Sequence, residues 1–333
     1  MQLKLSIQRN KPNLMLKGFH NRNGNSSLLY SIGPDLLELL LPTDAFLEYA
    51  VEIDYPFKSL GYAVELIGCC GGLVCLWFFG ERLFCIWNPA TGEYKVLPKS
   101  NIHCVDMVAF CYDYKSKDYK LLAGCCRLFE ACSLGSNSWK TIENVPYEFH
   151  ISNPSGVLVN GDLHWLAQRK GSSDVVLVSL DISNEIFKEV ELPKEPSEND
   201  LVFRNLGVLK GCLCLFVVDV GVCVEVWVMQ NYGVRESWTK RYIVSDKTKY
   251  LRLTWSFKNG EILFGGGYAG LYLYDSRDML AKPNFSRLSY LYQEGCYFES
   301  LVSLTSGTYV GEEKPIEKSN TLTYSMQWEN ILL

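Results

Sequence analysis

The amino-acid sequence predicts an all-β protein, a β-propeller of six four-stranded blades closed by pairing of its N- and C-terminal strands. Two observations carry this prediction. Short apolar runs, rich in aromatic and β-branched residues and too brief for helices, are separated by turn residues along the chain. These runs recur in groups of four with a period of roughly 47 residues, which is typical of a propeller because no single blade can bury both of its faces.

The clearest copy of the repeat lies at residues 68–98. An apolar strand, LVCLWFF, is followed by a polar break at residues 80–82 and by a second strand, LFCIWN. The turn NPATG then leads to a third strand, EYKVLP. Because Pro89 restricts φ and Gly92 accepts positive φ, this turn is expected to be tight.

The other copies follow in order along the chain. Their third strands are expected to end near Ser31, Asn88, Leu134, Asp181, Val228 and Asp275. The first copy lacks its first strand: it begins at residues 13–19 and is expected to end with a strand at residues 36–42. Helix is an open alternative for residues 34–50, whose periodicity is mixed. Residues 297–304 form a last, unaccompanied strand, so they are expected to pair with residues 13–19 and close the ring. Residues 43–65 are interpreted as a connection; if they formed strands, the number of blades would be seven.

Composition and charge limit the function. The net charge is −5 and lysine and arginine form no run, which argues against a nucleic-acid partner. The first residues lack the apolar core of a signal peptide, and residues 66–80, the longest uncharged apolar run, are too short to span a bilayer. Many of the 13 cysteines lie in apolar strands, so a reduced intracellular compartment, the cytoplasm or nucleus, is expected.

No catalytic residue, metal site or cofactor is predicted. The four histidines lack metal-binding spacing, no Cys-x-x-Cys motif occurs, and His164 in the strand DLHWLAQ is assigned to the core. The adjacent cysteines at residues 69–70 and 125–126 are expected to point to opposite strand faces and to pack there, without a redox role. Asp106, Asp113 and Asp118 are interpreted as turn formers, because they lack the spacing of a calcium loop. The recurring tryptophans are expected to pack between blades.

Several motifs recur in a fixed order. They are GGLVC at residues 71–75, IWNPATG at 86–92, YD and DYK at 112–113 and 118–120, SLGSNSW at 133–139, VNG and LHW at 159–161 and 163–165, and WVM and ESWTK at 227–229 and 236–240. With these motifs the sequence resembles the F-box associated domain of plant F-box proteins, a family that includes S-locus F-box-like and F-box/kelch-like proteins. The resemblance implies a remnant of the last F-box helix at residues 1–10, a propeller at residues 11–305 and a polar tail at residues 306–333.

The resemblance also implies a function. A domain of this family is the substrate-recognition module of an SCF-type E3 ubiquitin ligase, which binds a target protein and has no chemistry of its own. The Skp adaptor and the cullin are expected as partners only if a complete F-box is present. Two alternatives stay open: a truncated interaction propeller that does not engage the ligase, and a propeller enzyme, which needs convergent metal ligands or a carboxylate pair.

Candidate target-binding residues lie in loops that differ between the copies. The first-to-second-strand turns are short and uniform, as at Gly161, Gly211 and Gly260, whereas the second-to-third-strand loops and the connections between copies vary. The candidates are Phe79, Arg82, Lys170 and Tyr268. Aromatic and arginine side chains are common interface hot spots, although solvated loop residues are the simpler interpretation of each one. The N-terminal segment is expected on the opposite rim.

Overall fold

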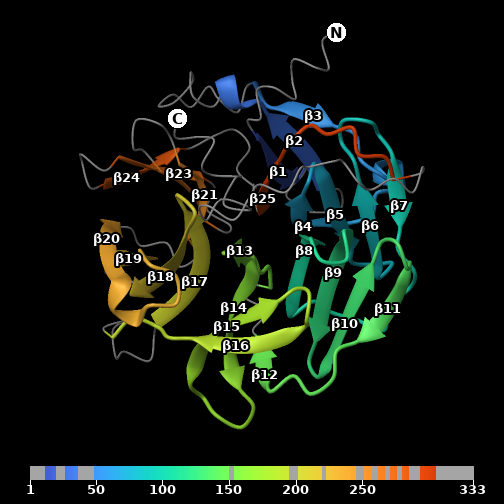
Figure 1. The fold of residues 1–333 in the computed structure, drawn as a ribbon. Coiled ribbons are helices and arrows are strands. Elements are labelled where there is room, and N and C mark those ends of the chain that lie inside the picture. Colours follow the sequence, from blue (N-terminus) through green and yellow to red (C-terminus); the bar gives the residue numbers. More distant parts are fainter. Residues whose placement is uncertain are drawn as a thin grey trace.

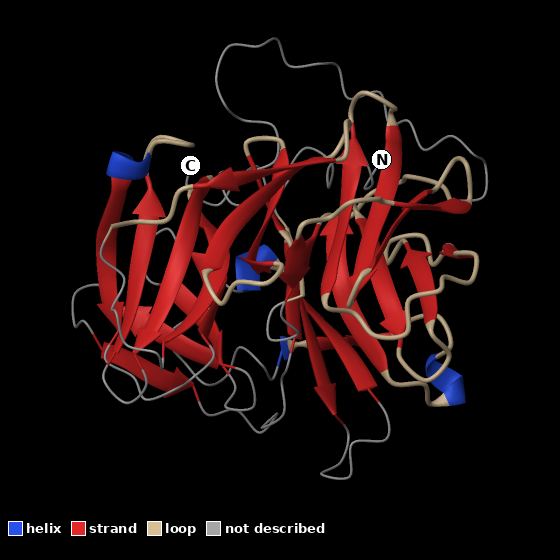
Figure 2. Cartoon of the chain, turned by 90° about the horizontal axis from the view of Figure 1, so that it is seen from below, coloured by secondary structure: helices blue, strands red, loops and turns tan. Residues whose placement is uncertain are grey.

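The computed structural model describes residues 12–19, 27–36, 49–149, 154–194, 202–219, 223–244, 251–256, 262–266, 271–275, 280–284 and 293–304. These residues form antiparallel sheets arranged in a ring (Figure 1). Helical structure among them is limited to short turns (Figure 2), including residues 34–36, η2 (Lys58–Leu60) and η3 (Arg235–Ser237). The predicted all-β propeller is therefore confirmed, while the helix expected at residues 1–10 and the tail at 306–333 lie outside the described residues.

The described strands form six sheets, and Figure 1 shows β4, β8 and β17 facing the middle of the ring while β7, β11 and β20 lie on its outside. Two successive sheets are β4 (Val64–Cys70), β5 (Leu73–Phe78), β6 (Leu83–Trp87) and β7 (Tyr94–Val96), then β8 (Met107–Asp113), β9 (Asp118–Cys125), β10 (Leu128–Ser133) and β11 (Ser138–Thr141). The third is β12 (Tyr147–Phe149), β13 (Val157–Val159), β14 (Asp162–Arg169), β15 (Val175–Asp181) and β16 (Ile186–Val190).

The remaining sheets have four strands each. They are β17 (Val202–Leu209), β18 (Cys212–Asp219), β19 (Cys223–Met229) and β20 (Trp238–Val244), then β21 (Leu251–Ser256), β22 (Ile262–Gly266), β23 (Leu271–Asp275) and β24 (Leu280–Asn284). The closing sheet has the order β25 (Gln293–Tyr297), β1 (Asn13–Phe19), β2 (Ser27–Ile32) and β3 (Val51–Ile53). The order of every sheet except the closing one follows the order of the chain.

One sheet departs from the predicted four strands. β12 and β13 both pair with β14, but on its two different halves: Tyr147 lies opposite Arg169, and Val157 lies opposite His164. Two short strands thus take the position that one strand takes elsewhere, so this sheet has five strands and the other five sheets have four. The prediction of four strands in every blade is wrong at this one place.

The two ends of the described chain close the ring. β25 pairs antiparallel with β1, with Asn13 opposite Tyr297 and Lys17 opposite Gln293. The predicted partner, residues 13–19, is right, but the predicted strand at residues 297–304 is wrong beyond its first residue, because the pairing segment ends at Tyr297. Residues 298–304 leave the sheet, and Val302 and Leu304 instead pack into the apolar cluster of the next interface. Their apolar pattern reflects that packing and not a strand.

The outer strand of the closing sheet also lies away from its predicted place. β3 falls inside the segment that was interpreted as a connection, and it pairs with β2 from Leu29 opposite Ile53 to Ser31 opposite Val51. The expected strand at residues 36–42 is wrong at its start, since residues 34–36 are helical. Val51 is 63% exposed, so this edge strand shows no apolar alternation that sequence could reveal.

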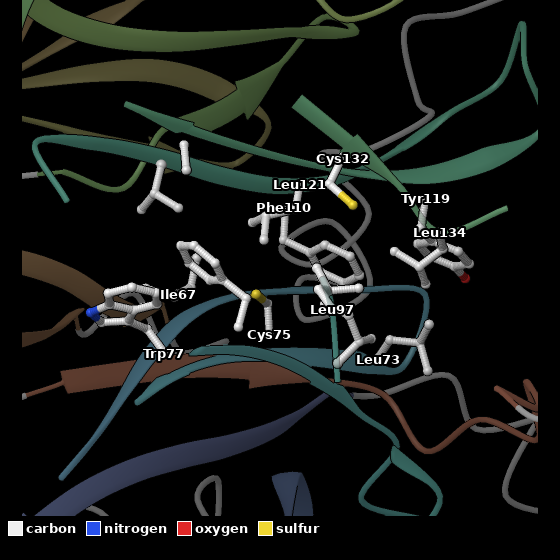
Figure 3. Close-up of a cluster of buried hydrophobic side chains, with 14 of the residues drawn as sticks. Ile67, Leu73, Cys75, Trp77, Leu97, Phe110, Tyr119, Leu121, Cys132 and Leu134 are labelled. Carbon is white, nitrogen blue, oxygen red and sulfur yellow. The ribbon is translucent and has the colours of Figure 1, made fainter. Parts of the chain in front are cut away.

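Apolar side chains fill the interfaces between neighbouring sheets. In the cluster of Figure 3, Cys75 and Trp77 from one sheet pack with Phe110 and Leu121 from the next. Similar clusters join the sheet of β8–β11 to that of β12–β16, and that sheet to β17–β20. The core is therefore divided among the interfaces, which makes each sheet dependent on its neighbours.

The tryptophans take part in these interfaces, as predicted. Trp139 Nε1 donates a hydrogen bond to Pro98 O at 2.7 Å, and Trp238 Nε1 donates to Glu191 O at 2.9 Å. In both cases a tryptophan of an outer strand reaches the end of the preceding sheet. The side chain of Trp255 lies outside the described residues. Among the helical turns that are described, none has the length and apolar character required to cross a bilayer.

Candidate protein-interaction face

Antiparallel pairing divides the connections of each sheet between two faces of the ring, because the chain reverses direction at every strand. One face, called here the turn face, carries the first-to-second-strand and third-to-fourth-strand turns, such as residues 71–72 and 88–93. The opposite face, called the loop face, carries the second-to-third-strand loops and the connections between sheets, such as residues 79–82 and 97–106.

The turn face is partly occupied by the segment that follows β25. Asn88 is fully buried, and its Nδ2 donates to Ser300 O at 3.0 Å and to Val302 O at 2.8 Å. Glu93 Oε2 accepts a hydrogen bond from Leu304 N at 2.7 Å. The NPATG turn between β6 and β7 therefore clamps this C-terminal segment onto the neighbouring sheet.

A second polar bridge on the turn face joins the sheet of β8–β11 to that of β12–β16. Asp113 Oδ1 accepts a hydrogen bond from Ser183 Oγ at 2.6 Å, and Asp113 Oδ2 lies 2.9 Å from Lys120 Nζ. Lys120 Nζ also donates to Ile182 O at 3.0 Å. Burial raises the pKa of Asp113, but the hydrogen bonds from Ser183, Lys120 and its own turn outweigh burial and hold this pKa far below its ordinary value. The ionised carboxylate thus serves the fold.

The three aspartates that the sequence grouped together do not form one cluster. Asp113 Oδ1 accepts a hydrogen bond from Lys115 N within its turn, as predicted. Asp118 instead begins β9, and its Oδ2 accepts from Gly135 N of the turn between β10 and β11. Asp106 precedes β8 and lies at its opposite end, on the loop face, where Asp106 Oδ2 accepts a hydrogen bond from Cys126 N at 2.7 Å. Asp106 and Asp113 lie at opposite ends of the extended strand β8, so they are far apart in space although they are close in sequence.

His164 is fully buried, which confirms its assignment to the core. Its Nε2 lies 2.8 Å from Tyr232 Oη and its Nδ1 lies 3.3 Å from Val157 O, so the ring ties β14 to the sheet of β17–β20. Burial lowers the pKa of His164 to about 4, which keeps the imidazole neutral at pH 7. Here too a polar group on the turn-face side is used for packing between sheets.

The loop between β5 and β6 presents two of the candidate side chains on the loop face. Phe79 is 60% exposed, and Arg82 adopts a φ of 53° in the same turn. Arg82 Nη1 lies 2.8 Å from His103 Nδ1 on the connection between β7 and β8. Because a guanidinium can only donate, His103 Nδ1 accepts this bond. An aromatic ring, a guanidinium and an imidazole are therefore presented together.

Lys170 stands on a different part of the loop face, after β14. The side chain of the neighbouring Arg169 is held by two hydrogen bonds: its Nε and Nη2 donate to Glu189 at 2.8 Å and 2.6 Å. These hydrogen bonds lower the pKa of Glu189. The backbone N of Lys170 donates to Pro146 O at 3.0 Å, and its side chain is exposed. Within the described ranges, no hydrogen bond or ion pair is recorded for its Nζ.

The structure therefore brings Phe79 and Arg82 together but not Lys170, which belongs to a sheet two places further along the chain. Tyr268 lies outside the described residues. His103 was not among the sequence candidates, because its contact with Arg82 joins two loops and leaves no local signal. Leu60, within the connection that the sequence placed on this face, is a further exposed apolar side chain at 59%.

Residues 29–268 match the family of F-box associated beta propeller domains. The chain belongs to this family. Over 233 residues it is 30% identical to the F-box protein CPR1 of Arabidopsis thaliana, which covers 60% of this chain and 56% of that protein. It is 29% identical over 247 residues to the Arabidopsis F-box protein At3g07870, which covers 62% of this chain and 58% of that protein. The chain therefore spans less than two thirds of these relatives.

A third relative and a solved structure extend the comparison. The chain is 27% identical over 253 residues to the Arabidopsis F-box/kelch-repeat protein At3g23880, covering 72% of this chain and 69% of that protein. A chain in the crystal structure of a nidogen/laminin complex superposes with a TM-score of 0.56 at 11% identity, covering 87% of this chain and 99% of that chain. At that identity the likeness concerns the fold alone.

Two of the motifs by which the sequence resembles F-box associated domains have a structural role in this domain. The NPATG turn clamps the C-terminal segment through Asn88. In the SLGSNSW motif, Gly135 N donates to Asp118 Oδ2 at 2.8 Å, and Trp139 reaches the preceding sheet. In this chain the first motif holds the C-terminal segment and the second makes a contact between sheets.

Proposed function

We propose that this F-box associated domain recognises a target protein for an SCF-type ubiquitin ligase, and that the target binds the loop face. Membership of the family and the F-box proteins among its relatives support the ligase part of the proposal. The loop-face part rests on one observation: Phe79, Arg82 and Lys170 are exposed there, whereas polar groups of the turn face hold the sheets together. Aromatic and arginine side chains are enriched at interfaces, and a lysine can pair with an acidic target.

The position of β1 supports a division of labour between the two faces. Asn13, at the start of β1, lies opposite Tyr297, after which the chain continues on the turn face. A segment that precedes β1 therefore approaches the propeller from the turn face. An F-box joined there, with its Skp adaptor and cullin, would lie on the side away from the loop face. A target held on the loop face would remain accessible to the ligase around the rim.

A triple substitution tests this proposal. The variant Phe79→Ala, Arg82→Ala and Lys170→Ala removes the three exposed anchors, and Lys210→Ala is the matched control because Lys210 is an exposed turn-face residue at the start of a uniform turn. Proteins that co-purify with the parent chain are quantified against both variants, and the direct binder is then titrated with purified protein. We expect at least a tenfold loss of affinity from the triple variant, since hot-spot truncations each cost about 1–2 kcal/mol or more.

Two results would contradict the proposal in different ways. Intact binding by the triple variant together with weaker binding by Lys210→Ala would place the target on the turn face. A bound partner that is not ubiquitinated by the reconstituted ligase containing this chain would support a binding propeller without delivery to a ligase. The second measurement therefore separates recognition from ubiquitination.

A further inference from the structure

Four potential metal ligands meet on the loop face, from segments well separated in the chain. Cys104 and Asp106 come from the connection between β7 and β8, Cys125 ends β9, and Cys126 begins the following turn. One ligand atom from each of these residues lies within 4.8 Å of all the others. In this structure Cys104 and Cys125 are joined by a disulfide. The expectation that Cys125 serves only packing is therefore wrong.

Local backbone structure explains why the sequence did not reveal this cluster. Adjacent residues of a strand point to opposite faces, but Cys126 lies beyond the end of β9 and has a φ of 56°. Its side chain therefore turns back, and Cys126 Sγ lies 3.8 Å from Cys125 Sγ. Asp106 is fixed beside them, because its N donates to Gly124 O at 2.9 Å and its Oδ2 accepts from Cys126 N at 2.7 Å.

The spacing of the sulfurs fits a tetrahedral metal centre. A Zn–S bond of about 2.3 Å and tetrahedral angles place two thiolate ligands about 3.8 Å apart. Cys125 and Cys126 already have this separation. The cluster therefore needs only the reduction of its disulfide to offer three thiolates.

Asp106 supplies a second, independent observation. It is 92% buried, being only 8% exposed, and its Oδ1 is buried without a hydrogen-bond partner among the described residues. A buried carboxylate oxygen without a partner costs free energy, which a bound cation would offset. Cys126 is exposed, so an ion has a route to the cluster from solvent.

We propose that the reduced cluster binds one Zn²⁺ through Cys104, Cys125, Cys126 and one carboxylate oxygen of Asp106, and that zinc and the disulfide exclude each other. A dithiol reductant supplies two electrons and two protons to the disulfide and leaves as its own disulfide. The three thiols then lose their protons to solvent as zinc binds. Three thiolates favour zinc over magnesium or calcium, and four protein ligands complete a structural tetrahedral site.

The site would tie the β7–β8 connection to the β9–β10 hairpin in either redox state. That connection also carries His103, the partner of Arg82, so the cluster fixes one edge of the exposed loop-face group. The proposal does not depend on the identity of any target protein. It concerns how the β7–β8 connection is fixed to the β9–β10 hairpin.

Metal titration of the whole chain tests the proposal. The protein is reduced with a dithiol, freed of metal by a chelator, transferred to buffer without either, and titrated with Co²⁺ and then with Zn²⁺. We expect one equivalent of Co²⁺ with the absorption bands of a tetrahedral cobalt thiolate, and displacement of Co²⁺ by Zn²⁺. The oxidised chain should bind neither ion at this site.

Substitutions locate the site. Cys126→Ser, at an exposed turn, and Asp106→Asn, which keeps an oxygen for the bond from Cys126 N, should each weaken zinc binding at least tenfold, as even outer-shell changes cost about 10–100-fold. Cys212→Ser on the turn face is the matched control and should bind as the parent does. Circular dichroism checks that each variant is folded. No stoichiometric binding by the reduced chain, equal binding by the oxidised chain, or unchanged affinity in Cys126→Ser would each overturn the proposal.

Discussion

The two faces of this propeller use the same repeated sheet in different ways. On the turn face, buried polar side chains such as Asn88, Asp113 and His164 connect one sheet to the next. On the loop face, Phe79 and Lys170 are exposed, and Arg82 contacts only the neighbouring loop through His103. Mutation of the two faces should therefore separate stability from recognition.

The difference has a simple physical origin. A propeller sheet buries its faces against two neighbours, so its ends must be held by contacts that cross between sheets. In the described residues many of these crossing contacts gather on the turn face, including the clamp on the C-terminal segment. Some loop-face connections also carry crossing contacts, such as Val108 N to Pro154 O at 2.7 Å. Exposed loops with little part in such contacts, such as residues 79–82, can vary at little cost to the fold, as is usual for loops on a rigid scaffold.

A large effect on stability is expected from removal of the clamped segment. A chain ending after Phe298 keeps β25 but loses Leu304, which is 4% exposed, and the hydrogen bonds to Asn88 and Glu93. We expect the free energy of unfolding to fall by about 4 kcal/mol, from one buried leucine and several hydrogen bonds. Urea denaturation measures this loss.

The matched control removes only the chain from Gly311 onward. That stretch is polar and lacks apolar periodicity, so its removal should cost little. If both truncations lowered the free energy of unfolding equally, the clamp on residues 300–304 would not be a source of stability.

The ends of the third strands could be predicted closely from the sequence. Their expected ends at Ser31, Asn88, Leu134, Asp181, Val228 and Asp275 fall within one residue of the observed ends of β2, β6, β10, β15, β19 and β23. Such a strand lies between two partners and is followed by a turn signal, so apolar pattern and turn chemistry agree. The exposed edge strand β3 lacks an apolar pattern, so its position could not be predicted in this way.

The candidate site was less accessible to sequence reasoning. Phe79, Arg82 and Lys170 could be selected because loops that vary between repeats are visible in the sequence itself. The contact of Arg82 with His103 and the meeting of Cys104 with Cys125 depend on two loops of neighbouring strands arriving at one place. No local pattern encodes either meeting, and that of Cys104 with Cys125 follows from the register of β8 and β9.

The next largest effect concerns pH and His164. Its pKa is lowered by burial to about 4, from an ordinary value of 6.5. Between these values the unfolded chain binds more protons, so stability is fully present above pH 6.5 and is lost as the pH falls toward 4. The full difference is about 3 kcal/mol. Chemical denaturation at several pH values measures it.

His164→Gln should flatten this part of the profile. Asp113 acts in a separate window, because its lowered pKa contributes stability above the ordinary carboxylate range that is lost only in stronger acid. An equal slope in His164→Gln and the parent chain between pH 6.5 and 4 would assign the dependence to another group.

The smallest effect on stability is expected on the loop face, and two adjacent phenylalanines provide the sharpest comparison. Phe78 is fully buried and contacts Phe57 at a ring-centroid distance of 5.5 Å, whereas Phe79 is 60% exposed. Phe78→Ala should lower the free energy of unfolding by about 3–5 kcal/mol through the cavity it leaves. Phe79→Ala should change it by less than about 0.5 kcal/mol, as is usual for surface positions. Thermal and urea denaturation of the two variants measure both values. A large loss from Phe79→Ala would show that the loop face is also structural, and a binding defect in that variant would then report misfolding instead of a lost contact.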